Sequence, residues 1–298
     1  MKTLFIETNY SEDFYLKQRN KIENVTCKHM FRNNDIISRL FRRLFLKLHL
    51  PVYWFFGEWS KKINDYDIAI LPVSIYSNSI IKLFKGKEEK LKHWYWNSIF
   101  TTLKPEDLNA SKKNIYTFDL DDSINYGINF LDTYYFSSIE IAQEKPKYDI
   151  CFIGADKGRL EYLLKLERFF NDNGLKSYFH IVRSERNQTE YKYKDRIGYK
   201  EVLNIISDSK MILDVVQEGQ QGKTQRPLEA LFLKKKLITT DPTVSKYDFY
   251  NVNNIFVIKD LNDSHLQKFI SSSMVEIDEI IKNKYDFKNW IKKITNNE

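Results

Sequence analysis

The sequence predicts an α/β fold of two doubly wound domains, and three observations lead to this prediction. Short apolar runs alternate with longer amphipathic runs along the chain, which is typical of strands alternating with helices. The chain has 298 residues, whereas one compact domain usually has ~100–200. Its residues are 42% hydrophobic and 29% charged, the composition of a globular rather than a disordered protein.

The elements of the first half follow from these patterns in order. A helix is expected over Asp35–Leu50, because its apolar residues recur at three- and four-residue steps. Asp35 suits the N-cap position, and Pro51 ends the pattern. The expected strands are the apolar runs Thr3–Ile6, Val25–Met30, Tyr66–Pro72, His93–Trp96 and Asn114–Phe118.

A charged segment with a proline, Gln143–Tyr148, separates the two halves and predicts domains over residues 1–142 and 148–298. Most strands of the second half precede a helix, so its sheet should be parallel, and each half should form a Rossmann-like unit. A long C-terminal helical region should begin at His265. The other expected elements are strands Asp149–Ile153, Ser177–Val182, Met211–Val215, Lys236–Thr239 and Asn254–Val257, and helices Arg159–Asn173, Lys200–Asp208 and Arg226–Phe232.

The charge and cysteine content narrow the choice of partner and compartment. A net charge of +7 suits an anionic partner, such as a phosphorylated small molecule, an anionic membrane surface or nucleic acid. The two cysteines, Cys27 and Cys151, are too few and too distant for a disulfide scaffold or a zinc site, which favours the cytoplasm. We expect neither a signal peptide nor a membrane-spanning run.

The first candidate site is Phe152–Arg159 (FIGADKGR), which follows an apolar strand and opens a helix. Open α/β sheets bind ligands at this edge. Gly154 and Gly158 let the backbone approach a ligand, and a helix N-terminus favours anions. Lys157 and Arg159 add positive charge. On these residues alone, a phosphate site and a tight turn with solvated charges are both open.

The second candidate site is Met211–Asp241, where a polar loop with Gly219 and Gly222 leads into a short helix. The Arg226 guanidinium could bind phosphate bidentately, and the Glu229 carboxylate could accept from ribose hydroxyls. The alternative is that Arg226 pairs with Glu229, which only complements the helix dipole. The density of such groups between a strand and a helix favours a functional site.

Together these segments resemble the C-terminal half of GT-B glycosyltransferases, with the greatest similarity to enzymes of bacterial lipopolysaccharide and capsular polysaccharide synthesis. The resemblance covers roughly residues 148–241. It is carried by Gly198–Leu203 (GYKEVL), Ser207-Asp208, Gly222 with Arg226–Leu231 (RPLEAL), and Lys236–Thr240 (KLITT).

The resemblance implies two Rossmann-like domains that face each other across a cleft, the second binding a nucleotide sugar and the first an acceptor. It implies that Glu229 holds the ribose and that the loop at Tyr199 lies near the base. Many retaining members carry an E-x7-E pair, but Gln221 replaces its first acid, so no stereochemical outcome is implied. The other donor-binding candidates are Gly154, Lys157, Gly158, Arg159, Gly219, Gly222, Lys223, Thr224 and Arg226.

A competing signal is the sequence Asp119-Leu120-Asp121, because D-x-D is the metal motif of GT-A glycosyltransferases. The following Asp122-Ser123 favours a helix cap instead, and we expect no metal and no other cofactor. An inverting enzyme needs a base to deprotonate the acceptor. Glu7, directly after the first strand, and Asp13 are the candidates, although an exposed loop acid is the more ordinary role for either.

The Asp35–Leu50 helix has two interpretations. A cationic face beside apolar and aromatic residues is how a helix lies on an anionic membrane. The alternative, which the sequence slightly favours, is a buried apolar stripe with a solvated basic face. Nucleic acid is not expected, because no recognisable binding fold accompanies the charge. The cationic residues of this helix are Arg39, Arg42, Arg43 and Lys47.

The sequence therefore predicts a cytoplasmic glycosyltransferase, at the inner face of the cell membrane if the helix binds lipid. It would move a sugar from a nucleotide sugar to a growing bacterial surface glycan such as lipopolysaccharide, capsule or exopolysaccharide. Two alternatives remain. One is an epimerase of the same architecture, and the other is a non-catalytic nucleotide-sugar-binding or scaffold protein of a polysaccharide assembly complex.

Overall fold

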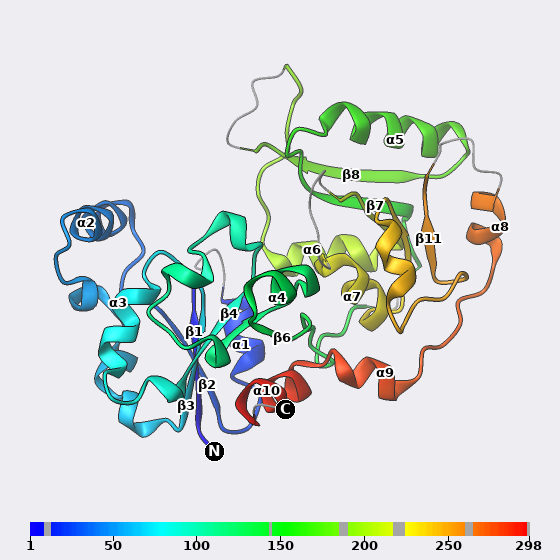
Figure 1. Ribbon diagram of the computed structural model, residues 1–298. Coiled ribbons are helices and arrows are strands. Elements are labelled where there is room, and N and C mark those ends of the chain that lie inside the picture. The colour runs from blue at the N-terminus through cyan, green and yellow to red at the C-terminus, as the bar shows by residue number, and fades with distance from the viewer. Residues whose placement is uncertain (9–12, 143–144, 185–189, 217–223, 260–264, 297–298) are drawn as a thin grey trace. The chain divides into compact units, whose positions relative to one another are not determined.

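The computed structural model of the protein describes residues 1–8, 13–142, 145–184, 190–216, 224–259 and 265–296. The chain divides into two compact units (Figure 1), of which the first comprises Met1–Thr133 and Phe287–Glu298 and the second Tyr134–Asp286. This division differs from the expected domains 1–142 and 148–298 in two ways. The first boundary falls earlier, and the C-terminal helix belongs to the first unit.

The first unit has a parallel sheet in the order β2-β1-β3-β4-β5-β6. Five of these strands match the expected runs, and the two-residue β6 was too short to leave a pattern. The strands are β1 Thr3–Glu7, β2 Val25–His29, β3 Ile68–Pro72, β4 Leu91–Tyr95, β5 Ile115–Thr117 and β6 Asn129–Phe130, and the helices are α1 Phe14–Arg19, α2 Ile36–Lys47, α3 Ser77–Ile81, α4 Leu120–Tyr126 and α10 Phe287–Asn296.

Helix α10 belongs to the core of the first unit. The ring of Trp290 lies 4.7 Å from that of Trp94 on β4 and stacks on Phe287 at 5.9 Å between centroids. The indole Nε1 of Trp290 donates to the carbonyl oxygen of Asp132 at 2.8 Å. Aromatic pairs of this geometry add to the apolar area that they bury, so the end of the chain completes the first unit.

The second unit has a parallel sheet in the order β11-β10-β9-β7-β8. Helix α5 covers it with Leu163, Leu166 and Phe170, which are all fully buried against the sheet residues Phe152 and Phe179. The strands are β7 Tyr148–Ala155, β8 Ser177–Val182, β9 Ser209–Asp214, β10 Lys236–Thr239 and β11 Ile255–Val257, and the helices are α5 Leu160–Asp172, α6 Tyr199–Ser207, α7 Gln225–Phe232, α8 His265–Ser271 and α9 Glu279–Lys284.

Each sheet has one point at which the chain changes the direction in which it adds strands. In the first unit this point lies between β1 and β3, and in the second it lies between β7 and β9. Because all the strands of a sheet are parallel, their carboxyl ends share one edge. Ligands of open α/β sheets bind in the crevice at such a switch point, so these two places are the candidate sites.

Helix α2 forms where the sequence predicts it, with Asp35 as N-cap accepting from the Ser38 N–H at 2.9 Å. Its orientation corrects the interpretation that the sequence slightly favours. The apolar residues, from Ile36 to Leu48, are largely exposed, whereas Arg42 is buried. In the part of the chain that the structure describes, no helix is long and apolar enough to cross a membrane.

Candidate functional site

The loop between β7 and α5 forms one wall of the second switch point. Gly158 has φ of +83° and Lys157 of +44°, left-handed conformations that glycine adopts easily and lysine rarely. Asp156, which is fully buried, fixes the turn by accepting from the Ser184 N–H at 3.0 Å and from the Tyr193 hydroxyl. Gly154 lies within β7 rather than in the loop. The backbone of this loop is therefore set, with the Lys157 side chain exposed.

Arg159 connects the two sides of this switch point. Its guanidinium Nη1 donates to the carbonyl oxygen of Val215, directly after β9, and Nη2 donates to Ala155 at the end of β7, at 3.4 Å. Burial lowers the pKa of Arg159, while the charge of nearby Asp214 opposes that shift. The arginine therefore places a positive charge between β7 and β9, as a phosphate site at this edge requires.

Asp214 ends β9 and is buried, with 5% of its surface exposed. Its Oδ2 accepts from the Thr239 hydroxyl at 3.0 Å and from the Thr224 hydroxyl at 3.2 Å. Desolvation raises the pKa of Asp214 to about 6, because burial disfavours the charged carboxylate. Sequence reasoning assigned no role to Asp214 or Asp156. The available signal was an acid at the end of an apolar strand.

Glu229 and Arg226 form an ion pair, as expected from the alternative in which Arg226 only pairs with Glu229. The Glu229 carboxylate is buried, with Oε2 accepting from Arg226 and Oε1 accepting from the Tyr199 hydroxyl at 2.7 Å. Arg226 also donates to the carbonyl oxygen of Ile153 on β7 at 2.9 Å. The Tyr199 hydroxyl lies 2.7 Å from that of Tyr135. The structure thus ties the start of α7 to β7 and to α6.

Two helices begin at this switch point, and neither has a side-chain cap. Arg159 precedes α5 and Thr224 precedes α7, and neither N-cap side chain bonds the first-turn amides of its own helix. In contrast, the N-cap carboxylates of Asp35 and Asp119 accept from the amides of α2 and α4. Uncapped helix N-termini carry unsatisfied N–H groups and partial positive charge, which suits an anion.

The structure therefore brings Gly158, Lys157, Arg159, Thr224 and Arg226 to the carboxyl ends of β7 and β9. Tyr199 and Glu229 lie behind them as partners of Arg226. Three further residues expected to bind the donor, Gly219, Gly222 and Lys223, lie outside the described residues.

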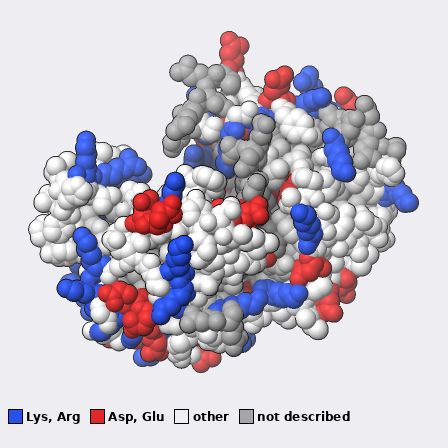
Figure 2. All heavy atoms as spheres, in the orientation of Figure 1, with Lys and Arg blue, Asp and Glu red and all other residues white. Residues whose placement is uncertain are grey.

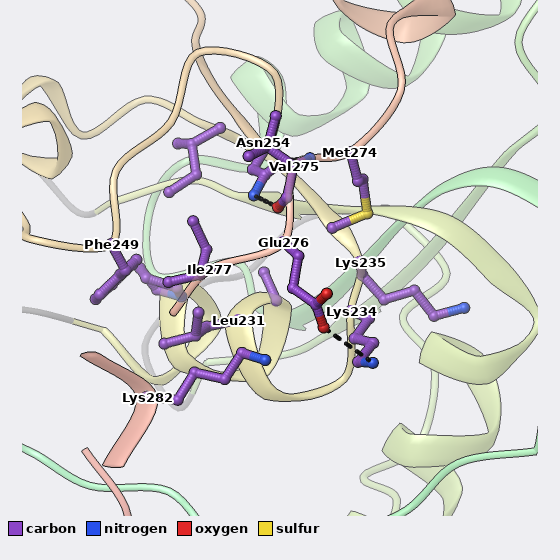
Figure 3. Close-up of a pocket in the computed structure, with 13 residues that line it drawn as sticks. Leu231, Lys234, Lys235, Phe249, Asn254, Met274, Val275, Glu276, Ile277 and Lys282 are labelled. Atoms are coloured by element: carbon purple, nitrogen blue, oxygen red, sulfur yellow. Dashed lines mark hydrogen bonds and ion pairs between the residues drawn. The ribbon is translucent and has the colours of Figure 1, made fainter. Parts of the chain in front are cut away.

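A separate pocket of about 300 Å³ lies at the opposite edge of the same sheet (Figure 3). It is lined by residues near the amino ends of β10 and β11, including Asn254. Its basic groups have protein partners: Lys235 donates to the carbonyl oxygens of Ser207 and Ser209, and Lys234 lies 3.9 Å from Glu276. Helix α7 contributes Pro227, Ala230 and Leu231 to its wall, but none of the residues gathered at the carboxyl ends of β7 and β9 lines this pocket.

The first unit has a pocket of about 290 Å³ at its own switch point. Glu7, at the end of β1, contributes to its wall, but the carboxylate is buried and pairs with Arg19. Asp13 is exposed, and its Oδ1 lies 2.9 Å from Nε2 of His29 at the end of β2. The pocket is lined by Glu7, Thr8, Tyr15, Arg19, Pro72, Trp96 and Asn97.

The D-x-D segment acts as a helix cap. The Asp119 carboxylate accepts from the Asp121 N–H at 2.9 Å and from the Asp122 N–H at 3.2 Å, at the start of α4. Among the described residues there is no group of three or more His, Cys, Asp or Glu side chains arranged to hold a metal ion. The helix cap is therefore Asp119, whereas the sequence suggested a cap at Asp122-Ser123, which lie inside α4.

No protein-family profile matches the chain, and no curated protein matches it in sequence. Solved structures, in contrast, match the chain in fold. One is a DNA-modifying β-glucosyltransferase, with TM-score 0.52 and 12% identity over 100% of this chain and 94% of that one. A putative UDP-N-acetylglucosamine 2-epimerase from Listeria monocytogenes has TM-score 0.50 and 7% identity over 98% and 94%.

A third similar structure is accessory secretory protein 1, 2 and 3 of Streptococcus pneumoniae, with TM-score 0.47 and 11% identity over 87% of this chain. This chain spans 58% of the length of that one. The two nearly full-length similarities confirm the α/β fold of two Rossmann-like units, as found in GT-B glycosyltransferases and epimerases.

Proposed function

We propose that the protein is a glycosyltransferase that uses a nucleotide sugar and needs no metal. The observation that carries this proposal is the second switch point, where the uncapped N-termini of α5 and α7 meet Lys157, Arg159 and Arg226. These groups suit the diphosphate of a nucleotide sugar in the crevice where such sheets bind ligands. The full-length fold similarity to a glucosyltransferase is consistent with it.

In this proposal cationic side chains, in place of a metal ion, stabilise the negative charge of the diphosphate. As the bond to the sugar breaks, negative charge grows on the leaving diphosphate, and fixed guanidinium groups and helix amides stabilise it. Lys157, Arg159, Thr224 and Arg226 contact the phosphates, together with the backbone at Gly158. Glu229 and Tyr199 act as positioning residues, because both carboxylate oxygens of Glu229 accept from protein donors.

The acceptor would occupy the pocket of the first unit. Its aromatic residues Tyr15 and Trp96 offer flat apolar surfaces, and its polar groups can bind hydroxyls. Glu7 is a poor candidate for the base, because its carboxylate is buried and pairs with Arg19. Asp13 is the remaining candidate base, because its carboxylate is exposed, with Oδ1 2.9 Å from Nε2 of His29. The proposed acceptor is a growing bacterial surface glycan, in keeping with the sequence resemblance.

The test is a thermal-shift screen against UDP-, GDP-, CMP- and dTDP-sugars, because a ligand of the folded state raises the melting temperature. Removing one charge-assisted contact costs about 1.5–3 kcal/mol, so Arg159→Ala should weaken donor binding by roughly 10- to 100-fold. Arg168→Ala, which removes an exposed arginine from the same helix, is the matched control. The donor site is refuted if no nucleotide sugar shifts the wild type.

The proposed glycosyltransferase and the two alternative functions differ in the products they form with and without an acceptor. A glycosyltransferase releases nucleoside diphosphate faster when an acceptor glycan is added. An epimerase converts the donor without an acceptor. Donor binding that is sensitive to Arg159→Ala, with neither transfer nor hydrolysis, would identify the non-catalytic binding protein.

A further inference from the structure

Helix α2 presents an apolar face that the rest of the described chain does not cover. Five of its apolar residues and its C-cap Leu48, together with the segment that follows, form what we call the α2 docking surface. The helix residues are between 48% and 67% exposed, and those that follow are between 45% and 60% exposed. Scattered exposed apolar residues are normal, but a contiguous patch marks an interaction site. The surface consists of Ile36, Ile37, Leu40, Phe41, Leu44, Leu48, Leu50, Tyr53 and Trp54.

This orientation is fixed by specific contacts on the opposite side of the helix. The Arg42 side chain is buried, donating to the carbonyl oxygen of Asn33 at 2.6 Å and to Oδ1 of Asn34 at 3.0 Å. Its guanidinium also lies 4.0 Å from the centroid of the Phe31 ring. A buried charge is costly unless it is hydrogen-bonded. Because these contacts satisfy the buried Arg42 guanidinium, they favour the orientation in which Arg42 faces the protein and the apolar face of α2 faces outward.

The exposed cations lie along one border of the apolar face. At about 100° per residue, the five apolar helix residues cover an arc of roughly 140° on the helical wheel. Arg39 and Arg43 fall on the adjoining arc, Lys47 falls just inside this border of the apolar arc, and all three are exposed. The inward residues Arg42 and Phe45 fall outside both arcs. The helix thus has an apolar face, a basic border and a buried side.

The segment that follows α2 continues the exposed apolar surface and, like α2, contains no acidic residue before Glu58. Trp54 is 60% exposed, and its ring centroid lies 6.1 Å from that of Phe45. Between Asp35 and Glu58 the sequence has no acidic residue. Figure 2 shows the surface over α2 as largely white, with Lys and Arg side chains at its edge. Tryptophan and tyrosine beside a basic apolar helix are typical of residues at the lipid headgroup level.

We propose that the α2 docking surface binds an anionic phospholipid bilayer, with the helix lying in the plane of the interface. The apolar face would enter the boundary of the acyl chains, while Arg39, Arg43 and Lys47 bind lipid phosphates. A second copy of the chain fits less well, because pairing two such faces would bring their basic borders together. This inference goes beyond the proposed function and does not depend on it.

The test is flotation of the full chain with vesicles of phosphatidylcholine alone or with 30 mol% phosphatidylglycerol added. The wild type should float with the anionic vesicles, and the emission of Trp54 should shift to shorter wavelength. Each basic residue near an anionic surface contributes a factor of roughly five in binding. The variant R39Q/R43Q/K47Q should therefore bind roughly 100-fold more weakly, and 0.5 M NaCl should have a similar effect.

The apolar contribution is tested with L40Q/F41Q/L44Q. These side chains are exposed, so the variant should fold normally yet lose binding to the anionic vesicles. The matched control is I124Q/V252Q/I280Q, which removes three residues of similar exposure elsewhere and should bind like the wild type.

Three results would overturn the proposal. The first is wild-type protein that does not float with anionic vesicles, and the second is an L40Q/F41Q/L44Q variant that floats as well as the wild type. The third is a concentration-dependent dimer that this variant abolishes, without lipid binding, which would assign the surface to a second copy. None of these results bears on nucleotide-sugar binding, which is measured without lipid.

Discussion

Replacing Glu229 by glutamine should destabilise the second unit, because it removes the negative charge from a buried ion pair. Glu229 is 1% exposed, and the Arg226 side chain is 19% exposed. Breaking a buried pair costs about 3–5 kcal/mol, since the remaining charge is left buried. Arg226 keeps some solvent and the carbonyl oxygen of Ile153, and the amide oxygen can still accept from Tyr199. We therefore expect a loss at the lower end, about 3 kcal/mol.

The assay is urea unfolding followed by far-UV circular dichroism. Tryptophan fluorescence gives a separate record of the first unit, which contains Trp54, Trp59, Trp94, Trp96 and Trp290, all five tryptophans of the chain. The fluorescence midpoint identifies any effect on the first unit, so the loss can be assigned to the second.

A double-mutant cycle with Arg226→Met isolates the pair. If Arg226 is already removed, Glu229→Gln should cost much less, giving a coupling energy of about 2 kcal/mol. Glu201→Gln, on the exposed side of α6, is the control and should stay within about 0.5 kcal/mol of wild type. The reasoning is refuted if Glu229→Gln is as mild as this control, or if the two substitutions are additive.

Four further predictions follow from described contacts. The pKa of Asp214 is about 6 in the folded protein, against an ordinary 3.8, so the folded state binds more protons between pH 4 and 6. The free energy of unfolding should therefore fall by up to about 3 kcal/mol as pH rises through that window, and urea titrations of Asp214→Asn should lack this fall. Burial raises the pKa of Cys27 to about 12 and of Cys151 to about 11, so Ellman's reagent should label both thiols only in denaturant. Asp119→Ala should cost about 1 kcal/mol by loss of the α4 cap, and Mn²⁺ should raise the melting temperature of neither protein. Gly158→Ala should cost about 1 kcal/mol through its positive φ alone, because nothing lies within 4 Å of the added carbon; a neutral result in thermal melts would contradict this.

Hydrophobic periodicity was sufficient to predict the α/β class, the strands longer than two residues and α2. It could not predict which side of α2 faces the protein. An apolar stripe is normally buried, and the burial of Arg42 depends on Phe31, Asn33 and Asn34, whose positions require the folded chain. The packing of α10 could not be predicted either, because nothing in its sequence indicates that it contacts Trp94.

The candidate site was predictable in its place and partly in its residues. A strand followed by glycines and basic residues identified Arg159 and the β7–α5 loop. The spacing of Arg226 and Glu229 allowed two interpretations, which were ligand binding by both residues or an ion pair between them. The structure contains the ion pair. The roles of Asp156 and Asp214 were not predicted, because an acid at the end of an apolar strand does not by itself identify its partners, which are hydroxyl and amide donors distant along the chain.

The return of α10 to the first unit has a consequence for the order of folding during synthesis. The second unit is one continuous stretch, Tyr134–Asp286, and can fold once that stretch has left the ribosome. The first unit needs Phe287 and Trp290, which are made afterwards. The nascent chain should therefore contain a finished second unit beside a first unit whose Trp94 surface is still uncovered, a state in which aggregation is a hazard. Removing residues 287–298 should make that state permanent.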